Sequence, residues 1–138
     1  MEAVRSEERT WGALTHILGL AGGIIPFGNI FGPLIMWQLK KIQSPFVDEN
    51  GKAAVNFQIS YTLYMIGLGL LFFVLFFGTI ASNAAADGEG AGLPITAILL
   101  GVVLVGFAIF QLVVMIMGAI KASKGEVYHY PLTIQFIK

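Results

Sequence analysis

Two stretches decide the fold of this chain: LYMIGLGLLFFVLFFGTI at residues 63–80 and ITAILLGVVLVGFAIFQLVVMIMGAI at residues 95–120. Neither contains a charged residue, although the chain carries 8 basic and 8 acidic residues in all. A surface helix of a soluble protein needs a polar face, and these stretches lack one. Their natural solvent is lipid. A hydrocarbon core about 30 Å thick needs about 20 apolar residues to cross it, so each stretch is long enough to span a membrane.

The composition of the whole chain agrees with that conclusion. Its 138 residues are 57% hydrophobic, with a mean hydropathy of +0.81. The length fits a single integral membrane domain over residues 1–138. A net charge of zero without any basic cluster argues against nucleic-acid binding, which depends on grouped Lys and Arg. The chain has no cysteine, so disulfides and thiol chemistry are excluded.

A third charge-free stretch, residues 10–39, is interrupted at Pro26 by PFGN, a sequence with turn chemistry. The pattern predicts a short helical hairpin with helices at 11–25 and 30–41. Even extended to Gln43, the second helix reaches only about 21 Å at 1.5 Å per residue. Two interpretations therefore compete: one kinked helix that crosses the membrane, or a hairpin whose tip lies inside or just across it. The predicted turn comprises Pro26, Gly28, Asn29, Gly32 and Pro33.

The distribution of basic residues predicts the topology. Three Lys lie in residues 40–52 and three more in residues 121–138, whereas residues 82–93 carry only Asp87 and Glu89. Basic loops remain cytoplasmic. A helix at about 53–81 therefore leads out of the cytoplasm, and a helix at about 94–123 leads back.

The N-terminal arm carries two Arg and no further basic residue before Lys40. If this arm is also cytoplasmic, the first unit crosses the membrane an even number of times, which favours the hairpin. The expected fold is all-α, with four helices and both termini on the cytoplasmic side of a bacterial inner membrane.

Residues between and after these helices give further local predictions. Ser44 before Pro45 resembles a helix start, and we expect a short interfacial segment at residues 45–50. Gly125 follows two Lys and can supply a left-handed cap for the last helix. Alternating apolar residues after Pro131 predict an extended tail on the membrane interface or on the protein.

His16 is the only side chain of a predicted span that titrates near neutral pH. An ionisable residue inside a membrane is a candidate functional group. The alternative is a neutral histidine that bonds a neighbouring helix, since no span contains Asp or Glu to receive a proton. The other histidine, His129, lies in the tail, and no Cys or buried carboxylate completes a metal site. The sequence therefore predicts no catalytic set, metal or cofactor.

The remaining polar side chains in apolar segments allow two interpretations. His16, Gln38 and Asn56, with Gln58 nearby, could line a polar groove that holds a ligand. Alternatively, they could form hydrogen bonds between helices, which contribute about 0.6–2 kcal/mol each in membranes. The first interpretation requires the side chains to converge on one cavity.

Several short motifs resemble those of a known family. They are Arg9-Thr10-Trp11 with His16, PFGNIFGPLIMW at 26–37, SPFVD at 44–48, AAVNFQ at 53–58, and KGE with Tyr130-Pro131 in the tail. Together they are similar to a small bacterial multi-pass membrane family related to the Tic-twenty protein-import component of the chloroplast inner envelope. The resemblance implies four helices with cytoplasmic termini and a role in moving or handling polypeptides.

Two functional hypotheses follow from these observations. The first is a non-enzymatic membrane component linked to translocation or to membrane-complex assembly, with lipid, further copies of itself or other membrane proteins as partners. The second is a small transporter or lipid-binding protein that uses the groove at His16, Gln38 and Asn56.

Overall fold

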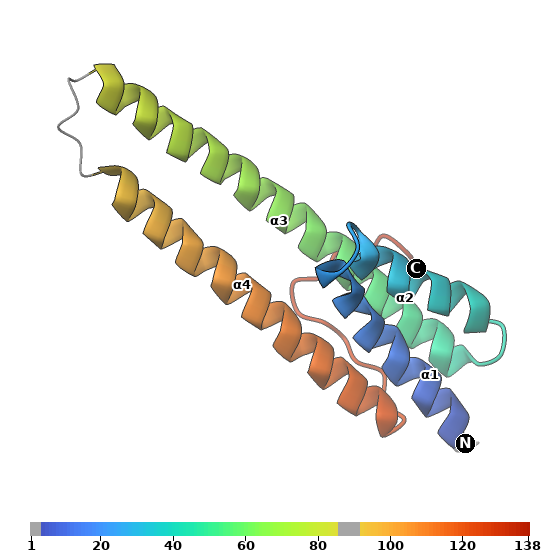
Figure 1. The fold of residues 1–138 in the computed structure, drawn as a ribbon. Helices are drawn as coiled ribbons and strands as arrows, with labels where there is room; N and C mark the ends of the chain where they lie inside the picture. Colours follow the sequence, from blue (N-terminus) through green and yellow to red (C-terminus); the bar gives the residue numbers. More distant parts are fainter. Residues whose placement is uncertain (1–3, 86–91) are drawn as a thin grey trace. The chain divides into compact units, whose positions relative to one another are not determined.

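The computed structural model describes residues 4–85 and 92–138, and this part of the chain is helical without any strand. Its elements are α1 (Ser6–Ile17), a 3₁₀ helix η1 (Leu18–Gly23), α2 (Gly28–Lys40), α3 (Pro45–Ala85) and α4 (Gly92–Ser123) (Figure 1). The predicted all-α fold with four helices, two of them long and apolar, is confirmed.

The N-terminal hairpin consists of α1 and η1 in its first arm and α2 in its second. The first arm begins at Ser6 rather than residue 11, and its α-helical part ends at Ile17. Three glycines occupy the 3₁₀ segment that follows, and glycine weakens an α-helix. The second arm begins after Phe27, whose φ of 59° is left-handed.

Close backbone approach holds the two arms of the hairpin together. A Cβ added at Gly28 would lie 2.5 Å from the carbonyl oxygen of Ala21. A Cβ at Gly32 would lie 2.5 Å from the carbonyl oxygen of Leu18. Any side chain at either position would force the arms apart, because real Cβ contacts are never this short.

The start of α3 differs from the prediction. Residues 45–50 do not form a separate interfacial segment, and the helix does not begin near residue 53. One continuous helix starts at Pro45, where the N–H of Asp48 donates to the carbonyl of Ser44 at 3.0 Å. Gly51 lies within this helix, and the Trp37 ring of α2 occupies the space where a side chain at this position would be.

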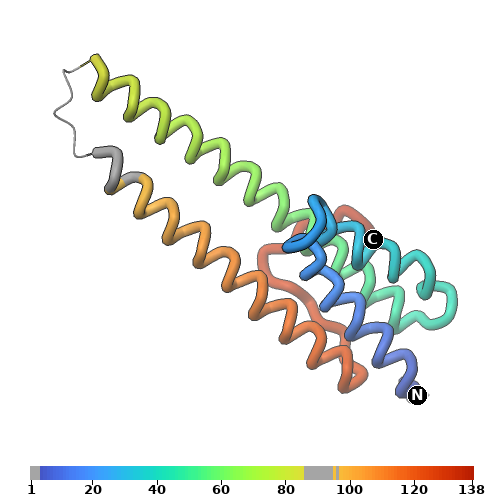
Figure 2. The backbone as a smooth tube through the Cα atoms, viewed as in Figure 1, coloured from blue at the N-terminus to red at the C-terminus, as the bar shows by residue number. Residues whose placement is uncertain are grey.

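The end of α4 matches the prediction in detail. Gly125 has a φ of 85°. Its N–H donates to the carbonyl of Ala122, and the N–H of Glu126 donates to the carbonyl of Lys121, each at 3.0 Å. These two bonds form a Schellman cap. After it, the tail (residues 126–138) returns along α3 (Figure 2).

The chain divides into two compact units, which we call unit 1 (residues 1–61 and 111–138) and unit 2 (residues 62–110). Unit 1 contains the hairpin, the beginning of α3, the end of α4 and the tail. Its buried side chains come from all of these segments. The buried apolar residues of unit 1 are Trp37, Val47, Ala54, Val55, Phe57, Tyr61, Val114, Met115, Ala119, Ala122, Tyr128 and Tyr130.

Unit 2 contains the remaining lengths of α3 and α4. The rings of Tyr64 and Phe107 meet edge to face, with centroids 6.4 Å apart. Large apolar side chains around these helices, such as Leu70 and Val105, are more than half exposed. Two helices of the described chain, α3 and α4 from Ala97, are long and apolar enough to cross a membrane. With such apolar surfaces and no charged face, this is a membrane protein.

Candidate functional site: a buried polar network beside a pocket

His16 lies at the centre of a buried polar network in unit 1. Its side chain is fully buried, and both ring nitrogens are bonded. Nδ1 lies 2.7 Å from the hydroxyl of Tyr130 in the tail, and Nε2 lies 2.9 Å from Oδ1 of Asn50 on α3. One imidazole therefore connects α1, α3 and the tail.

The hydrogen bonds around Asn50 fix the tautomer of His16. Nδ2 of Asn50 donates to the carbonyl of Phe46 at 3.0 Å, which leaves Oδ1 as an acceptor toward the ring. Nε2 of His16 must then carry the hydrogen and Nδ1 must accept from Tyr130. The ring is fully buried and has no charged partner among these groups, and burial of this kind favours the neutral form of a histidine.

Tyr130 is held from several directions. Its ring stacks on Phe57, with centroids 4.2 Å apart and planes inclined by 9°. Burial, together with the nearby Tyr128, raises the pKa of its phenol well above the ordinary value, so it remains a hydrogen-bond donor. Gly118 of α4 makes room for it, because a Cβ there would lie 2.8 Å from the Tyr130 hydroxyl.

Asn56 holds the end of the tail against α3. Its Oδ1 accepts from the N–H groups of Phe136 at 3.1 Å and Ile137 at 2.9 Å. Its Nδ2 donates to the carbonyl of Ile137 at 2.8 Å. One turn further along, Oγ of Ser60 accepts from the N–H of Ile134 at 2.9 Å. An extended backbone exposes such groups, and two polar side chains of α3 satisfy them.

A second polar cluster surrounds Gln58, whose side chain is buried. Its Oε1 accepts from Asn29 of α2 at 3.2 Å and from Gln111 of α4 at 2.9 Å. Its Nε2 donates to the sulfur of Met115 at 3.2 Å. This cluster joins three helices of unit 1 without any charged group.

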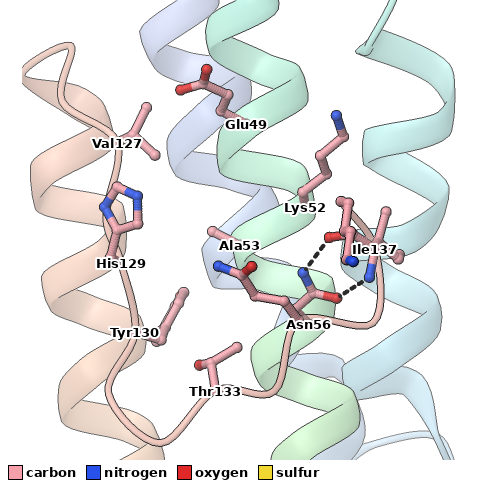
Figure 3. Close-up of a pocket in the computed structure, with 11 residues that line it drawn as sticks. Glu49, Lys52, Ala53, Asn56, Val127, His129, Tyr130, Thr133 and Ile137 are labelled. Atoms are coloured by element: carbon pink, nitrogen blue, oxygen red, sulfur yellow. Dashed lines mark hydrogen bonds between the residues drawn. The ribbon is translucent and has the colours of Figure 1, made fainter.

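A pocket lies between α3 and the tail. Its volume is about 560 Å³, and Figure 3 shows Asn56 at its centre, bonded to Ile137, with Glu49 and Lys52 above it. Oγ1 of Thr133 lines this pocket and is a buried polar atom without a hydrogen-bond partner. The pocket is lined by Glu49, Lys52, Ala53, Asn56, Val127, His129, Tyr130, Thr133, Gln135, Ile137 and Lys138.

The structure does not bring the predicted groove residues together. His16 bonds Asn50 and Tyr130, whereas Asn56 bonds the tail backbone. Gln38 lies exposed on α2. Of the predicted set, only Asn56 lines the pocket. The groove as predicted is therefore absent, because each buried member already has its own protein partner.

The residues of the predicted hairpin turn have separate roles. Pro26 is exposed at the tip, and Pro33 is buried within α2. Asn29 bonds Gln58, while Gly28 and Gly32 permit contact between the two arms. The turn therefore serves the packing of the hairpin.

No sequence pattern indicated that Asn50 and Tyr130 would be the partners of His16. Asn50 belongs to a polar segment, and Tyr130 lies 114 positions from His16 along the chain. Among residues 4–85 and 92–138, no group of three or more His, Cys, Asp or Glu is placed to hold a metal ion.

Comparison with known proteins corrects the family resemblance. The model of the magnetosome magnetite crystal formation protein family matches residues 7–137. No curated protein and no solved structure matches the chain. The similarity to the Tic-twenty import family is therefore wrong, and the translocation role that it implied loses its support.

Proposed function

The chain belongs to the magnetosome magnetite crystal formation protein family, and on this premise we propose that it is a non-enzymatic component of the magnetosome membrane that takes part in magnetite crystal formation. The observation that carries the proposal is the extent of the match. Residues 7–137 include the hairpin, both apolar helices and the tail held by Asn56. The family is thus matched over the whole architecture rather than over the apolar spans alone.

The buried polar groups of unit 1 support a non-enzymatic role. Both nitrogens of His16 are used in bonds to protein groups, as are both amide atoms of Gln58. A catalytic group must be able to exchange its partner for substrate. These groups instead join helices and tail into one body, which is what a membrane-anchored platform needs.

The charge distribution suggests which side this platform faces. Lys40, Lys41 and Lys52 belong to unit 1, and so do the lysines that follow Ile120. The preference of basic loops for the cytoplasm then places both termini inside. Unit 1 would lie on the cytoplasmic face, away from an enclosed crystal. We propose that the protein supports crystal formation by organising other membrane components from that face.

A complementation experiment tests this proposal. The chain, expressed in a magnetite-forming bacterium that lacks its own member of the family, should restore crystal size and number in electron micrographs. His16→Ala, which disturbs unit 1, should fail. The control variant Gln43→Ala, which changes an exposed polar side chain of unit 1 outside the pocket, should succeed.

A second pair of variants separates two routes of action. Asp87→Asn with Glu89→Gln neutralises the only charged residues between the apolar helices, which lie outside the described residues. If this double variant fails to restore crystals while His16→Ala restores them, the protein acts through the segment between its two apolar helices. The platform proposal is then wrong. If the wild-type chain restores nothing and purified magnetosomes do not contain it, the role in crystal formation is wrong.

The pocket favours a second candidate function, the binding of a small polar molecule. Thr133 offers a buried hydroxyl without a partner, and such groups usually have one. Native mass spectrometry of protein extracted from its own membranes tests this idea. A bound mass that Thr133→Val removes supports it, whereas identical ligand-free spectra for both proteins exclude it.

A further inference from the structure

One face of the hairpin carries large apolar side chains that no other part of unit 1 covers. Ile24, at the tip, is 87% exposed, and Leu39, near the other end, is 68% exposed. On α2 the exposed positions recur every three or four residues, which places them on one side of a helix. We call this surface the hairpin face; it comprises Ile24, Ile25, Phe27, Phe31, Ile35, Leu39 and Ile42.

The opposite side of α2 already makes the contacts that hold the hairpin in unit 1. Trp37 is buried there and donates from Nε1 to Oδ1 of Asp48 at 2.7 Å. At the other end, Asn29 bonds Gln58. The hairpin face is therefore free to contact something outside the protein, and contiguous apolar surfaces of this kind mark interaction sites.

The length of the hairpin limits what it can do in a membrane. The 13 residues of α2 rise only about 20 Å, against a hydrocarbon core of about 30 Å. Its contacts with Asp48 and Gln58 lie on the first part of α3. From Gln58, α3 continues to Ala85, which is about 40 Å of further helix.

The end of the hairpin next to the α2–α3 connection, on both sides of α2, has the composition of a membrane interface. Nζ of Lys40 lies 4.1 Å from the ring centre of Trp11, and Nζ of Lys41 lies 4.8 Å from that of Trp37. Tryptophan is enriched where headgroups meet acyl chains. Lysines at that depth attract anionic headgroups.

From these observations we propose that the hairpin lies in one leaflet without crossing the bilayer. The hairpin face contacts acyl chains, while Lys40 and Lys41 contact the headgroups of anionic lipids on the cytoplasmic side. The occupant of the face is lipid, and the continuity of the same chain with two membrane-spanning helices favours lipid over a protein partner. This proposal is independent of the role in crystal formation.

Depth-dependent quenching tests the proposal on the full chain. The protein has no cysteine, so single cysteines can be introduced directly and labelled with an environment-sensitive fluorophore. The labels go at Ile25, Ile35 and Leu39 on the hairpin face. Leu70, exposed on α3 in unit 2, provides a deep reference, and exposed Gln43 provides an aqueous one. Each protein is reconstituted in vesicles of phosphatidylcholine and phosphatidylglycerol with quenchers at shallow or deep acyl positions.

The expected result is a graded pattern. Shallow quenchers should act more strongly than deep ones on the three hairpin labels, and the order should reverse at position 70. Position 43 should escape both. In vesicles of phosphatidylcholine alone, or after Lys40→Gln with Lys41→Gln, quenching at position 39 should fall more than quenching at position 70.

Three results would overturn the proposal. A membrane-impermeant thiol reagent that reaches position 25 only from the side opposite position 43 would show that the hairpin crosses. Hairpin labels that resist both quenchers would show that lipid does not cover the face. Resistance combined with disulfide formation between two copies at position 35 would identify a second copy as the occupant.

Discussion

Most glycines of unit 1 and the described glycines of unit 2 occupy opposite environments. In unit 1, a Cβ added at Gly12, Gly22 or Gly118 would lie within 2.8 Å of another residue's atoms. In unit 2, a Cβ added at Gly67, Gly69, Gly78, Gly101 or Gly106 would meet nothing within 4 Å. The same residue type therefore serves close packing in one unit and merely reduces the lipid-facing surface in the other.

Polar side chains follow the same division. Those of unit 1 form bonds between segments that are distant in sequence, as His16 does with Tyr130. In unit 2, the hydroxyls of Thr79 and Ser82 donate hydrogen bonds to the carbonyls four residues earlier on the same helix. Unit 1 is thus stabilised by specific contacts between distant segments, whereas the hydroxyls of Thr79 and Ser82 in unit 2 bond only within their own helix. Four predictions test this difference, from the largest expected effect to the smallest.

The largest effect is expected for His16→Ala. The substitution leaves the Asn50 and Tyr130 groups without their partner and creates a cavity, so the free energy of unfolding should fall by about 3–5 kcal/mol. Thermal unfolding in detergent micelles measures this loss. The control His129→Ala removes an exposed ring and should leave the midpoint unchanged. Equal midpoints for both variants would contradict the network described here.

Gly51→Ala and Gly69→Ala form a matched pair on the same helix. The added methyl at Gly51 would meet the Trp37 ring, which should cost about 1–3 kcal/mol. The methyl at Gly69 enters open space, and the better helix propensity of alanine should raise stability by up to about 1 kcal/mol. Opposite shifts in the unfolding midpoint are expected. Shifts of the same sign would remove the distinction between the two units.

Asn56→Leu should release the end of the tail without unfolding the helices. The amide N–H groups of Phe136 and Ile137 lose their acceptor, a loss of about 0.5–1.5 kcal/mol per bond. Hydrogen exchange should accelerate at these two amides. Ser60→Ala provides the comparison, because it should accelerate exchange at Ile134 and leave the other two protected. Unchanged exchange in both variants would mean that other contacts hold the tail.

The smallest effect is expected for Gln111→Leu. Gln58 loses one of its two donors but keeps Asn29, so the cost should be about 0.6 kcal/mol, an average value for one hydrogen bond between membrane helices. The unfolding midpoint should move only slightly. A loss as large as that of His16→Ala would show that the Gln58 cluster, rather than the histidine, is the main bond between the helices of unit 1.

Particular residues show how far the sequence alone could lead. The left-handed cap at Gly125 and the break at Pro26 between the two arms of the hairpin were predicted because each depends on residues close in sequence. The separate segment at residues 45–50 was wrong, because the helix that starts at Pro45 continues through Gly51, where the Trp37 ring of α2 packs against the glycine. The polar groove was wrong for a similar reason: polarity identified which side chains need partners but not which partners they find.

The sequence by itself determined that this is a helical membrane protein. The absence of charge over a span and the position of lysines are local properties, and they govern how each segment partitions between lipid and water. Only the tertiary structure decided that His16 would meet Asn50 and Tyr130, and that Asn56 would hold the tail. Those bonds join positions far apart along the chain, and no local pattern specifies them. They depend on how closely the glycine-lined segments of unit 1 approach one another.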